Sequence, residues 1–250
     1  MSAQQVLKIT SSIDLRSHTY TSSSWLSYFH GNKSGASEIL FPEKIVLPSE
    51  LQQSLLASLQ RFQIGESGDG QHLKKYAAAV NDPVYEQCID LFVKENQSHA
   101  GMLAQIIKSM DGSLLAGHWS ERAFVMLRRM FGLKTEVFVL MIAEVIGKCF
   151  YKNLADHIDN KTLKEAFSLI VIDEIFHLEF HCSFMSEQTR QYSAVFRQVL
   201  SYLWFALFYA AALVFIFDHG RVFQAIKVSR SAFLSQCTST FKRTASKVLT

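Results

Sequence analysis

The chain has 250 residues, of which 49% are hydrophobic and only 3 are proline, and its formal net charge is +3. This length suits one generous domain or two small ones, and so few prolines favour long helices over a β-sandwich or barrel. Lys and Arg gather near the C-terminus without alternating with aromatic residues, so nucleic-acid binding is not expected.

The first 40 residues are rich in Ser and Thr, and we expect them to form a flexible or surface-draped arm. Residues 41–250 are expected to form a single helical domain, because no stretch alternates with period two for long enough to propose a strand. Capping and turn signals separate its helices. In chain order we expect helices at 50–80, 83–110, a minor one at 120–131, about 134–158, 161–187, about 191–217 and about 221–246.

The predicted fold class is therefore all-α. A four-helix bundle would occupy about residues 50–187, and additional C-terminal helices would occupy about 191–246. Gly65, Gly68 and Gly70 interrupt the first of the bundle helices. They either open that helix for a substrate or dioxygen or allow close packing.

The most apolar stretch is 199–217, VLSYLWFALFYAAALVFIF, in which Ser201 is the one strongly polar side chain. It is long enough to cross a membrane. A helix that is apolar all round can equally lie buried in a bundle or in a dimer interface. Membrane association through 199–217 and a homodimer both stay open.

The four cysteines show neither a CxxC motif nor zinc-ligand spacing, which indicates reduced thiols in a reducing compartment. The N-terminus has no basic segment followed by an apolar one, so no secretory signal is expected. These features predict a cytoplasmic protein, with membrane association as the open alternative.

The stretch VIDEIFHLEFH, residues 171–181, places acids and histidines within an apolar helix. At 100° per residue, Glu174, His177 and His181 fall on one face, and Asp173 lies beside them. Unpaired buried charge costs several kcal/mol, so this face requires a partner.

The other bundle helices supply matching residues, namely Glu66 on the first, Glu95 and His99 on the second and Glu144 on the third. Glu66 and Glu95 are 29 residues apart, and Glu144 and Glu174 are 30 apart. Each half thus has an acid, a helix-loop-helix length, and an acid followed about one turn later by a histidine. Four carboxylates and two imidazoles in a bundle core are what two iron or manganese ions require. The predicted metal ligands are Glu66, Glu95, His99, Glu144, Glu174 and His177.

This pattern resembles the ferritin-like di-iron carboxylate superfamily over roughly residues 50–225. The run from Asp173 to His177 is similar to the DExxH of rubrerythrin-like proteins and of p-aminobenzoate N-oxygenase-like enzymes. GESGDG, ENQSHA and DHGRVF also resemble an uncharacterised bacterial group of ferritin-like proteins. The resemblance implies a ferritin-like four-helix bundle and two iron ions, with manganese or a mixed pair as alternatives.

The first half departs from the superfamily pattern. The residue three before His99 is Asn96, where the usual ligand is glutamate, and Glu95 lies four before it. Either Glu95 is the ligand after a slight helix adjustment, or Asn96 replaces a carboxylate. We favour Glu95, because two cations need the anionic charge.

Three further residues are candidates for supporting roles. Asp173 is expected to accept a hydrogen bond from the non-ligating nitrogen of a metal-bound histidine and so fix its tautomer. His181 is either a further ligand or a core histidine. Tyr151 lies seven residues after Glu144, on the same face. It either hydrogen-bonds a ligand, lies close enough for electron transfer, or simply packs.

The leading functional hypothesis is a non-haem di-iron oxygenase or oxidase that uses dioxygen or peroxide to oxidise a small organic substrate. No flavin or nicotinamide motif is present, so electrons would come from an external donor. The second hypothesis is iron or peroxide handling without an organic substrate, as in ferritin or rubrerythrin. The third is a membrane-attached helical protein with a vestigial metal site.

Overall fold

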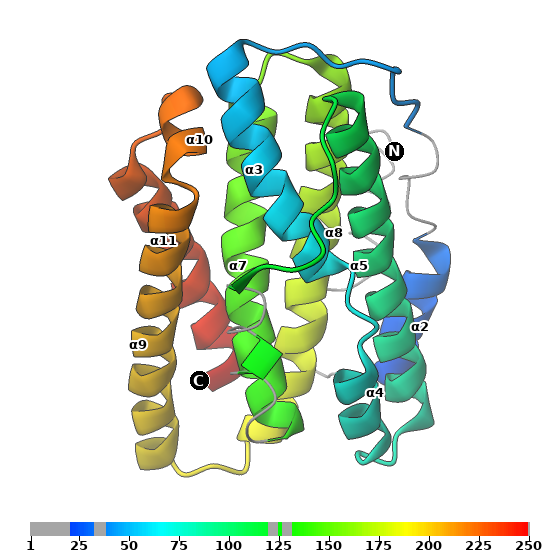
Figure 1. The fold of residues 1–250 in the computed structure, drawn as a ribbon. Coiled ribbons are helices and arrows are strands. Elements are labelled where there is room, and N and C mark those ends of the chain that lie inside the picture. Colours follow the sequence, from blue (N-terminus) through cyan, green and yellow to red (C-terminus); the bar gives the residue numbers. More distant parts are fainter. Residues whose placement is uncertain (1–20, 33–38, 120–124, 127–131, 250) are drawn as a thin grey trace.

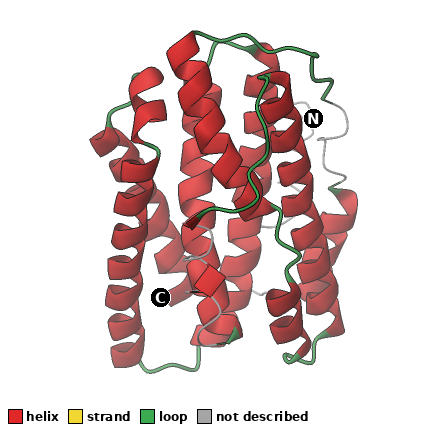
Figure 2. Cartoon of the chain, viewed as in Figure 1, coloured by secondary structure: helices red, strands yellow, loops and turns green. Residues whose placement is uncertain are grey.

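The computed structural model describes residues 21–32, 39–119, 125–126 and 132–249. Within these ranges every regular element is a helix and none is a strand (Figures 1 and 2). This confirms the all-α prediction. In chain order the helices are α2 (Ser22–Gly31), α3 (Ser49–Glu66), α4 (Gln71–Ala78), α5 (Pro83–Ser109), α7 (Leu133–His157), α8 (Lys161–Thr189), α9 (Ala194–Asp218), α10 (Gly220–Ala225) and α11 (Arg230–Leu249).

The bounds of α5, α7 and α8 agree with the sequence prediction to within two residues, because strong local signals mark their ends. Asp82 caps α5, its Oδ1 accepting hydrogen bonds from the backbone N–H groups of Val84 and Tyr85 at 3.0 and 3.1 Å. Asn160 caps α8 by accepting from Leu163 N–H at 3.0 Å. Such caps satisfy donors that a helix leaves unpaired in its first turn.

Replacing Asp82 with alanine should therefore lower the free energy of unfolding by about 1 kcal/mol. Asp82 also accepts a hydrogen bond from Ser22 Oγ at 2.5 Å, which joins α2 to the start of α5. Asp82→Asn keeps an accepting oxygen and should retain most of the stability. Urea unfolding followed by circular dichroism measures both variants, and an unchanged Asp82→Ala variant would show that the cap contributes nothing.

The long helices pack as antiparallel neighbours, α3 against α5 and α7 against α8, and α5 also contacts α8 (Figure 1). Helix α4 contacts both α5 and α7, and α11 lies against α7, α8 and α9. The shared interior holds fully buried rings that include Phe92, Phe150, Phe167 and Phe180. The inward faces of α5, α7 and α8 thus meet around the polar residues singled out in the sequence.

Residues 22–31 of the expected N-terminal arm form the helix α2, which packs on α5. Trp25, Tyr28 and Phe29 are buried there. The Tyr28 ring stacks on Phe176 of α8 at a centroid distance of 4.5 Å. Burial of three aromatic side chains offsets the entropy of ordering this Ser-rich segment. Residues 1–20 of the expected arm lie outside the described ranges.

Two of the predicted helices are in fact divided. The helix expected at 50–80 breaks into α3 and α4, and Gly70 takes a left-handed conformation at φ 67°. A Cβ at Gly70 would lie 2.5 Å from Val93, so a larger residue there meets both strain and a clash. The helix expected at 221–246 breaks into α10 and α11 at Lys227, which has φ 58°. The minor helix expected at 120–131 lies mostly outside the described residues.

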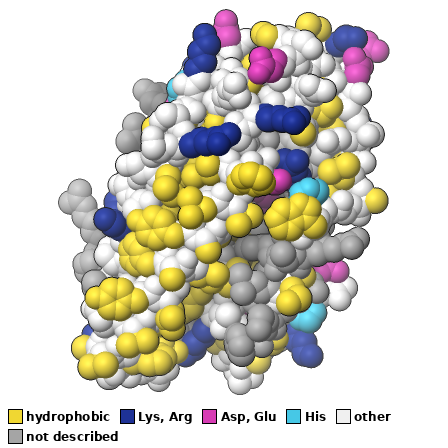
Figure 3. Space-filling view, turned by 60° about the vertical axis from the view of Figure 1, so that its left-hand side comes forward, with side chains coloured by type: hydrophobic (Ala, Val, Ile, Leu, Met, Phe, Trp, Pro, Cys, Tyr) yellow, Lys and Arg dark blue, Asp and Glu magenta, His cyan; other side chains and the backbone are white. Residues whose placement is uncertain are grey.

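Helix α9 packs by one face only. Trp204 and Phe208 are buried, and Trp204 Nε1 donates a hydrogen bond to Phe138 O of α7 at 2.9 Å. The opposite face carries exposed apolar side chains, among them Leu203 and Phe217, and contributes to the apolar surface in Figure 3. Among the described helices α9 alone is long and apolar enough to cross a membrane, and 22% of its most apolar window is buried.

Candidate metal centre

Four helices bring acids and histidines to one buried place. The ligand atoms of Glu66, His99 and Glu174 lie within 4.8 Å of one another, and so do those of Glu144, Glu174 and His177. The residues come from the end of α3 and from the middle of α5, α7 and α8. Glu174 belongs to both groups, so the two groups form one continuous cluster.

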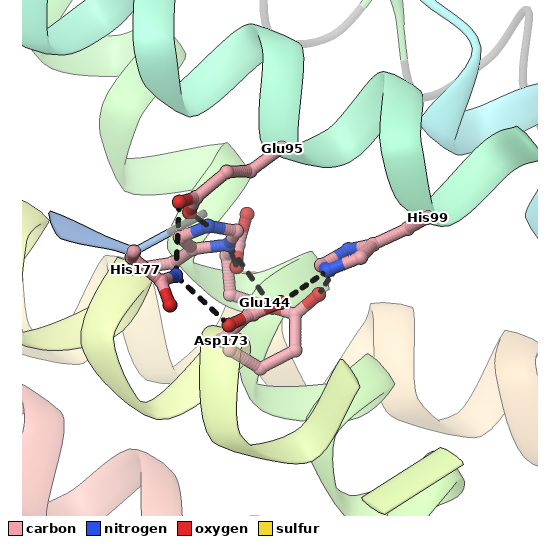
Figure 4. Close-up of polar contacts among 7 residues, drawn as sticks. Glu95, His99, Glu144, Asp173 and His177 are labelled. Atoms are coloured by element: carbon pink, nitrogen blue, oxygen red, sulfur yellow. Dashed lines mark hydrogen bonds and ion pairs between the residues drawn. The ribbon is translucent and has the colours of Figure 1, made fainter. Parts of the chain in front are cut away.

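Glu174 divides its two oxygens between the histidines. Its Oε1 lies 3.9 Å from His99 Nδ1, and its Oε2 lies 3.9 Å from His177 Nδ1. Glu144 Oε2 lies 3.4 Å from the same His177 nitrogen. Nδ1 of each ring therefore faces a different oxygen of the same carboxylate, Glu174. Figure 4 shows the two rings, His99 and His177, with the labelled acids around them.

The other nitrogen of each ring contacts a carboxylate on the opposite helix. His99 Nε2 on α5 lies 3.0 Å from Asp173 Oδ2 on α8, and His177 Nε2 on α8 lies 2.9 Å from Glu95 Oε2 on α5. In this reciprocal arrangement each carboxylate holds a proton on Nε2 of the ring it contacts. Nδ1 is therefore the nitrogen of each ring that a metal ion would bind. Asp173 thus has the contact expected of it, as the acceptor of a hydrogen bond from a histidine ring nitrogen.

Asn32 connects the two outer carboxylates. Its Nδ2 donates to Glu95 Oε1 at 2.9 Å and to Asp173 Oδ1 at 3.1 Å. Sequence reasoning missed this residue, because it follows α2 in a segment expected to be a flexible arm. With Asn32 in place, all four oxygens of Glu95 and Asp173 have hydrogen-bond partners.

The close packing of these groups shifts their protonation. Burial, and then the charge of Glu174, raises the pKa of Glu66 to about 7. Burial, and then Glu144, raises the pKa of Glu174 to about 8. Burial alone would lower the pKa of His99, but its hydrogen bond to Asp173 and the neighbouring carboxylates raise it to about 9. A bound cation would favour the ionised carboxylates and the deprotonated imidazole nitrogens, and would therefore lower these raised pKa values.

The donor set fits metal ions. Carboxylate oxygens and imidazole nitrogens suit iron, manganese and zinc. Glu144 Oε2, Glu174 Oε2 and His99 Nδ1 are buried without a hydrogen-bond partner among the described residues. Buried polar atoms are normally paired, and each of the two groups holds such unpaired atoms, so a cation could be accommodated in either group.

Five of the six predicted ligands, Glu66, His99, Glu144, Glu174 and His177, belong to the two groups. The sixth, Glu95, does not. Both of its oxygens are engaged, one by Asn32 and one by His177 Nε2. Its alternative, Asn96, has a buried Oδ1 without a hydrogen-bond partner among the described residues.

Tyr151 is fully buried on α7 and packs against Phe62, with the ring centroids 4.9 Å apart. Burial, and then the charge of Glu66, raises its pKa well above the usual value, so the hydroxyl stays protonated. Its oxygen has no hydrogen-bond partner among the described residues. The charges of the acidic cluster therefore influence the pKa of Tyr151, and its observed contact is packing against Phe62.

His181 lies one turn beyond His177 but belongs to neither group. Its ring is fully buried and lies 4.8 Å from the centroid of Phe92 and 5.0 Å from that of Phe180. Burial, and then the charge of His177, lowers the pKa of His181 to about 3, so the ring is neutral. Both ring nitrogens lack a hydrogen-bond partner among the described residues.

Replacing His181 with leucine should therefore raise the free energy of unfolding by about 1 kcal/mol, because it removes two unsatisfied buried nitrogens at similar volume. Metal content should not change. Urea unfolding and metal analysis check the two parts. A leucine variant that loses one metal ion would show instead that His181 is a ligand.

A cavity of about 270 Å³ opens beside the cluster. Glu66, Asn96, Glu144 and Glu174 are among the residues that line it. Phe62, Phe92 and Phe215 are among the apolar side chains of its walls, and Arg61 and His219 also line it. The acidic cluster is therefore buried from solvent on most sides but accessible through a largely apolar space.

Comparison with known proteins found no matching family model, curated protein or solved structure. The functional proposals below therefore depend on the geometry of this chain.

Proposed function

We propose that this protein is a ferritin-like oxidoreductase with a dinuclear metal centre. Helices α3, α5, α7 and α8 would be its four-helix bundle. One metal ion would be held by Glu66, His99 and Glu174, and the other by Glu144, Glu174 and His177. The observation that carries the proposal is Glu174, whose two oxygens face the Nδ1 atoms of two different histidines at 3.9 Å each.

Two iron ions, with manganese or a mixed pair as alternatives, would supply the activation of dioxygen or peroxide for oxidising a small organic substrate. The chain itself orients the donor atoms. Asp173 and Glu95 keep the Nε2 proton of each histidine, which fixes the tautomer and the ring direction. The apolar walls of the cavity exclude bulk water from the reacting side.

We assign Glu95 to this supporting role and not to metal ligation. Replacing Glu95 with glutamine should weaken metal affinity about 10- to 100-fold, the usual effect of losing a carboxylate behind a histidine ligand. Both ions should still bind at saturation. Calorimetric metal titration checks this, and loss of one ion at all concentrations would restore Glu95 as a ligand.

The cavity favours an organic substrate over simple iron or peroxide handling. Storage or peroxide removal requires passage of small polar species only, whereas this space is lined by phenylalanine side chains next to the candidate ligands. Pockets with apolar walls and a few polar groups are typical of small-molecule sites. Electrons would come from a separate donor.

Dioxygen consumption tests the proposal. Protein loaded anaerobically with ferrous iron is mixed with oxygenated buffer, with and without a panel of aryl amines and aliphatic or aromatic acids. We expect an organic compound to stimulate oxygen uptake and to be oxidised, and Glu174→Gln to remove both effects. Oxygen uptake that no compound alters would favour iron or peroxide handling, and no uptake despite bound iron would contradict an oxidoreductase.

A further inference from the structure

The two halves of the centre differ in charge at one position, three residues before the histidine. On α8, Asp173 lies four residues and Glu174 three residues before His177. On α5, Glu95 and Asn96 hold the same two positions relative to His99. Since Glu95 and Asp173 have equivalent hydrogen bonds, Asn96 is the counterpart of the shared carboxylate Glu174.

This difference removes one negative charge from the inner side of the centre. Glu66, Glu144 and Glu174 supply the three carboxylates of the two groups, whereas Glu95 and Asp173 lie behind the histidines as hydrogen-bond partners. A glutamate at 96 would supply a fourth. A neutral amide is a weaker metal ligand than a carboxylate, so an anion from outside could take the ligand position beside it.

The same side is the accessible one. Asn96 lines the cavity together with Glu66, Glu144 and Glu174, and Phe62, Phe92 and Phe215 lie on its walls. A molecule bound in this space would therefore contact both the apolar walls and the position left by the missing carboxylate.

Arg61 on the cavity wall does not offer an equivalent anion site. Its Nε lies 3.4 Å from Asp218 Oδ2, and its Nη1 donates to Asp218 O at 3.2 Å. The charge of Arg61 is thus already balanced. An entering anion would therefore be attracted to the two metal ions and not to Arg61.

We propose that the substrate is a carboxylate-bearing, otherwise apolar small molecule whose carboxylate binds the metal pair beside Asn96. This inference rests on the dinuclear centre of the proposed function. The Asn96 amide donates a hydrogen bond to the entering carboxylate, and the phenylalanine walls hold the apolar body. Glutamate at position 96 would occupy the place of the substrate carboxylate.

Benzoate and its neutral isostere benzamide are the probes. Protein loaded anaerobically with Mn²⁺ is titrated with each by calorimetry, and the manganese electron paramagnetic resonance spectrum is recorded in parallel. We expect benzoate to bind the loaded protein and change the spectrum. Benzamide, and benzoate with metal-free protein, should show at least tenfold weaker binding.

The variants locate the carboxylate. Asn96→Glu should weaken benzoate binding at least tenfold while strengthening metal binding. Asn96→Gln introduces a side chain as long as glutamate but neutral, and should bind benzoate as the natural protein does. Arg61→Gln should leave benzoate affinity within a factor of about three. Equal binding by Asn96→Glu, or loss of binding in Arg61→Gln, overturns the inference. Two bound Mn²⁺ without benzoate binding overturns it too, whereas failure to bind Mn²⁺ refutes the proposed function itself.

A separate observation concerns the exposed face of α9. Its residues Val199, Leu203, Ala206, Ala210, Leu213 and Phe217 are all exposed and follow one another at spacings of 4, 3, 4, 3 and 4. Alternating spacings of three and four residues give the 3.5-residue apolar repeat of coiled coils, in which two helices pack along their length. The order is also nearly symmetrical, with two alanines at the centre, a leucine on either side of them and a larger apolar residue at each end.

Such symmetry suits pairing with a second copy. In an antiparallel pair related by a two-fold axis, Ala206 would face Ala210 of the second copy and Leu203 would face its Leu213. The nine large apolar side chains of α9 that are 38–87% exposed leave on the order of 1,000 Å² accessible, against about 800 Å² buried per partner in a standard interface.

The composition of α9 argues against a membrane as the partner of its exposed face. Arg197 is the one basic residue of α9, whereas helices that lie on membranes are rich in Lys and Arg along their polar side. The opposite face of α9 holds Trp204 and Phe208 against the rest of the domain. We infer that α9 pairs antiparallel with α9 of a second copy.

Sedimentation and cysteine crosslinking test this pairing. The natural protein should sediment as a dimer, and Ala210→Glu should be monomeric with unchanged circular dichroism. A mixture of Leu203→Cys and Leu213→Cys proteins should form a heterodimeric disulfide, and each single variant alone should not, nor should Val199→Cys mixed with Leu203→Cys. A monomeric natural protein, or one that floats with phosphatidylcholine vesicles until Ala210→Glu releases it, overturns the inference.

Discussion

Replacing Glu174 with glutamine is expected to abolish binding of both metal ions. The two oxygens of Glu174 are shared between the groups, so the loss of its charge removes a ligand from each ion at once. Glu66→Gln and Glu144→Gln should each weaken one ion selectively, because each residue belongs to one group. We expect at least a hundredfold loss of affinity per affected ion, more than the loss of a residue behind a ligand causes.

Glu179→Gln is the matched control for this experiment. Glu179 lies on the same helix but forms an ion pair with Lys247 away from the cluster. Calorimetric titration with Mn²⁺ should give two ions per chain for the natural protein and for Glu179→Gln, one tight ion for Glu66→Gln or Glu144→Gln, and none for Glu174→Gln. A Glu174→Gln protein that keeps one tight ion would show that the groups do not share this ligand.

The metal-free protein should lose stability between pH 6.5 and pH 8. The pKa values of Glu174 and His99 are raised to about 8 and about 9 in the folded state. Each group therefore stabilises the fold fully below its unfolded pKa and loses that contribution as the pH rises through its folded pKa. His181 and His219 act oppositely, since burial lowers their pKa values to about 3, but their effect is complete above pH 6.5.

We expect the free energy of unfolding to fall on the order of 3 kcal/mol over this range, since each proton difference contributes about 1.4 kcal/mol per pH unit. Urea unfolding with a chelator measures it. In saturating Mn²⁺ the fall should disappear or reverse, because metal binding needs the deprotonated ligands and strengthens with pH. Equal pH profiles with and without metal would argue against ligation by this cluster.

The sequence was sufficient to predict α5, α7 and α8, three of the four helices that carry the site. Asn160 and the Asp82-Pro83 pair mark where α8 and α5 begin, and these signals act within a few residues. The inward faces followed from helical periodicity, so Glu144, Glu174 and His177 could be expected to meet before their tertiary contacts were known.

Details that depend on tertiary packing were not predictable in the same way. Glu95 and Asn96 lie four and three residues before His99, and both positions are close to its face. The helix α8 decides between them, since it brings His177 Nε2 to 2.9 Å from Glu95 Oε2. Sequence periodicity on α5 contains no information about this partner.

The N-terminal segment illustrates a second limit. Its Ser-rich composition predicted an arm, yet Trp25, Tyr28 and Phe29 are spaced three and four residues apart and cover the neighbouring helices. That apolar spacing was the available signal for α2. Nothing in the sequence near Asn32 indicated its hydrogen bonds to Glu95 and Asp173, because they join residues far apart in the chain.

Anomalous diffraction at the manganese or iron absorption edge, from crystals grown with that metal, tests the dinuclear centre most directly. We expect two peaks on either side of Glu174, one adjoining Glu66 and His99 and the other adjoining Glu144 and His177. No peak at this cluster in metal-saturated crystals, or a single peak that Glu174 does not contact, would contradict the proposed centre.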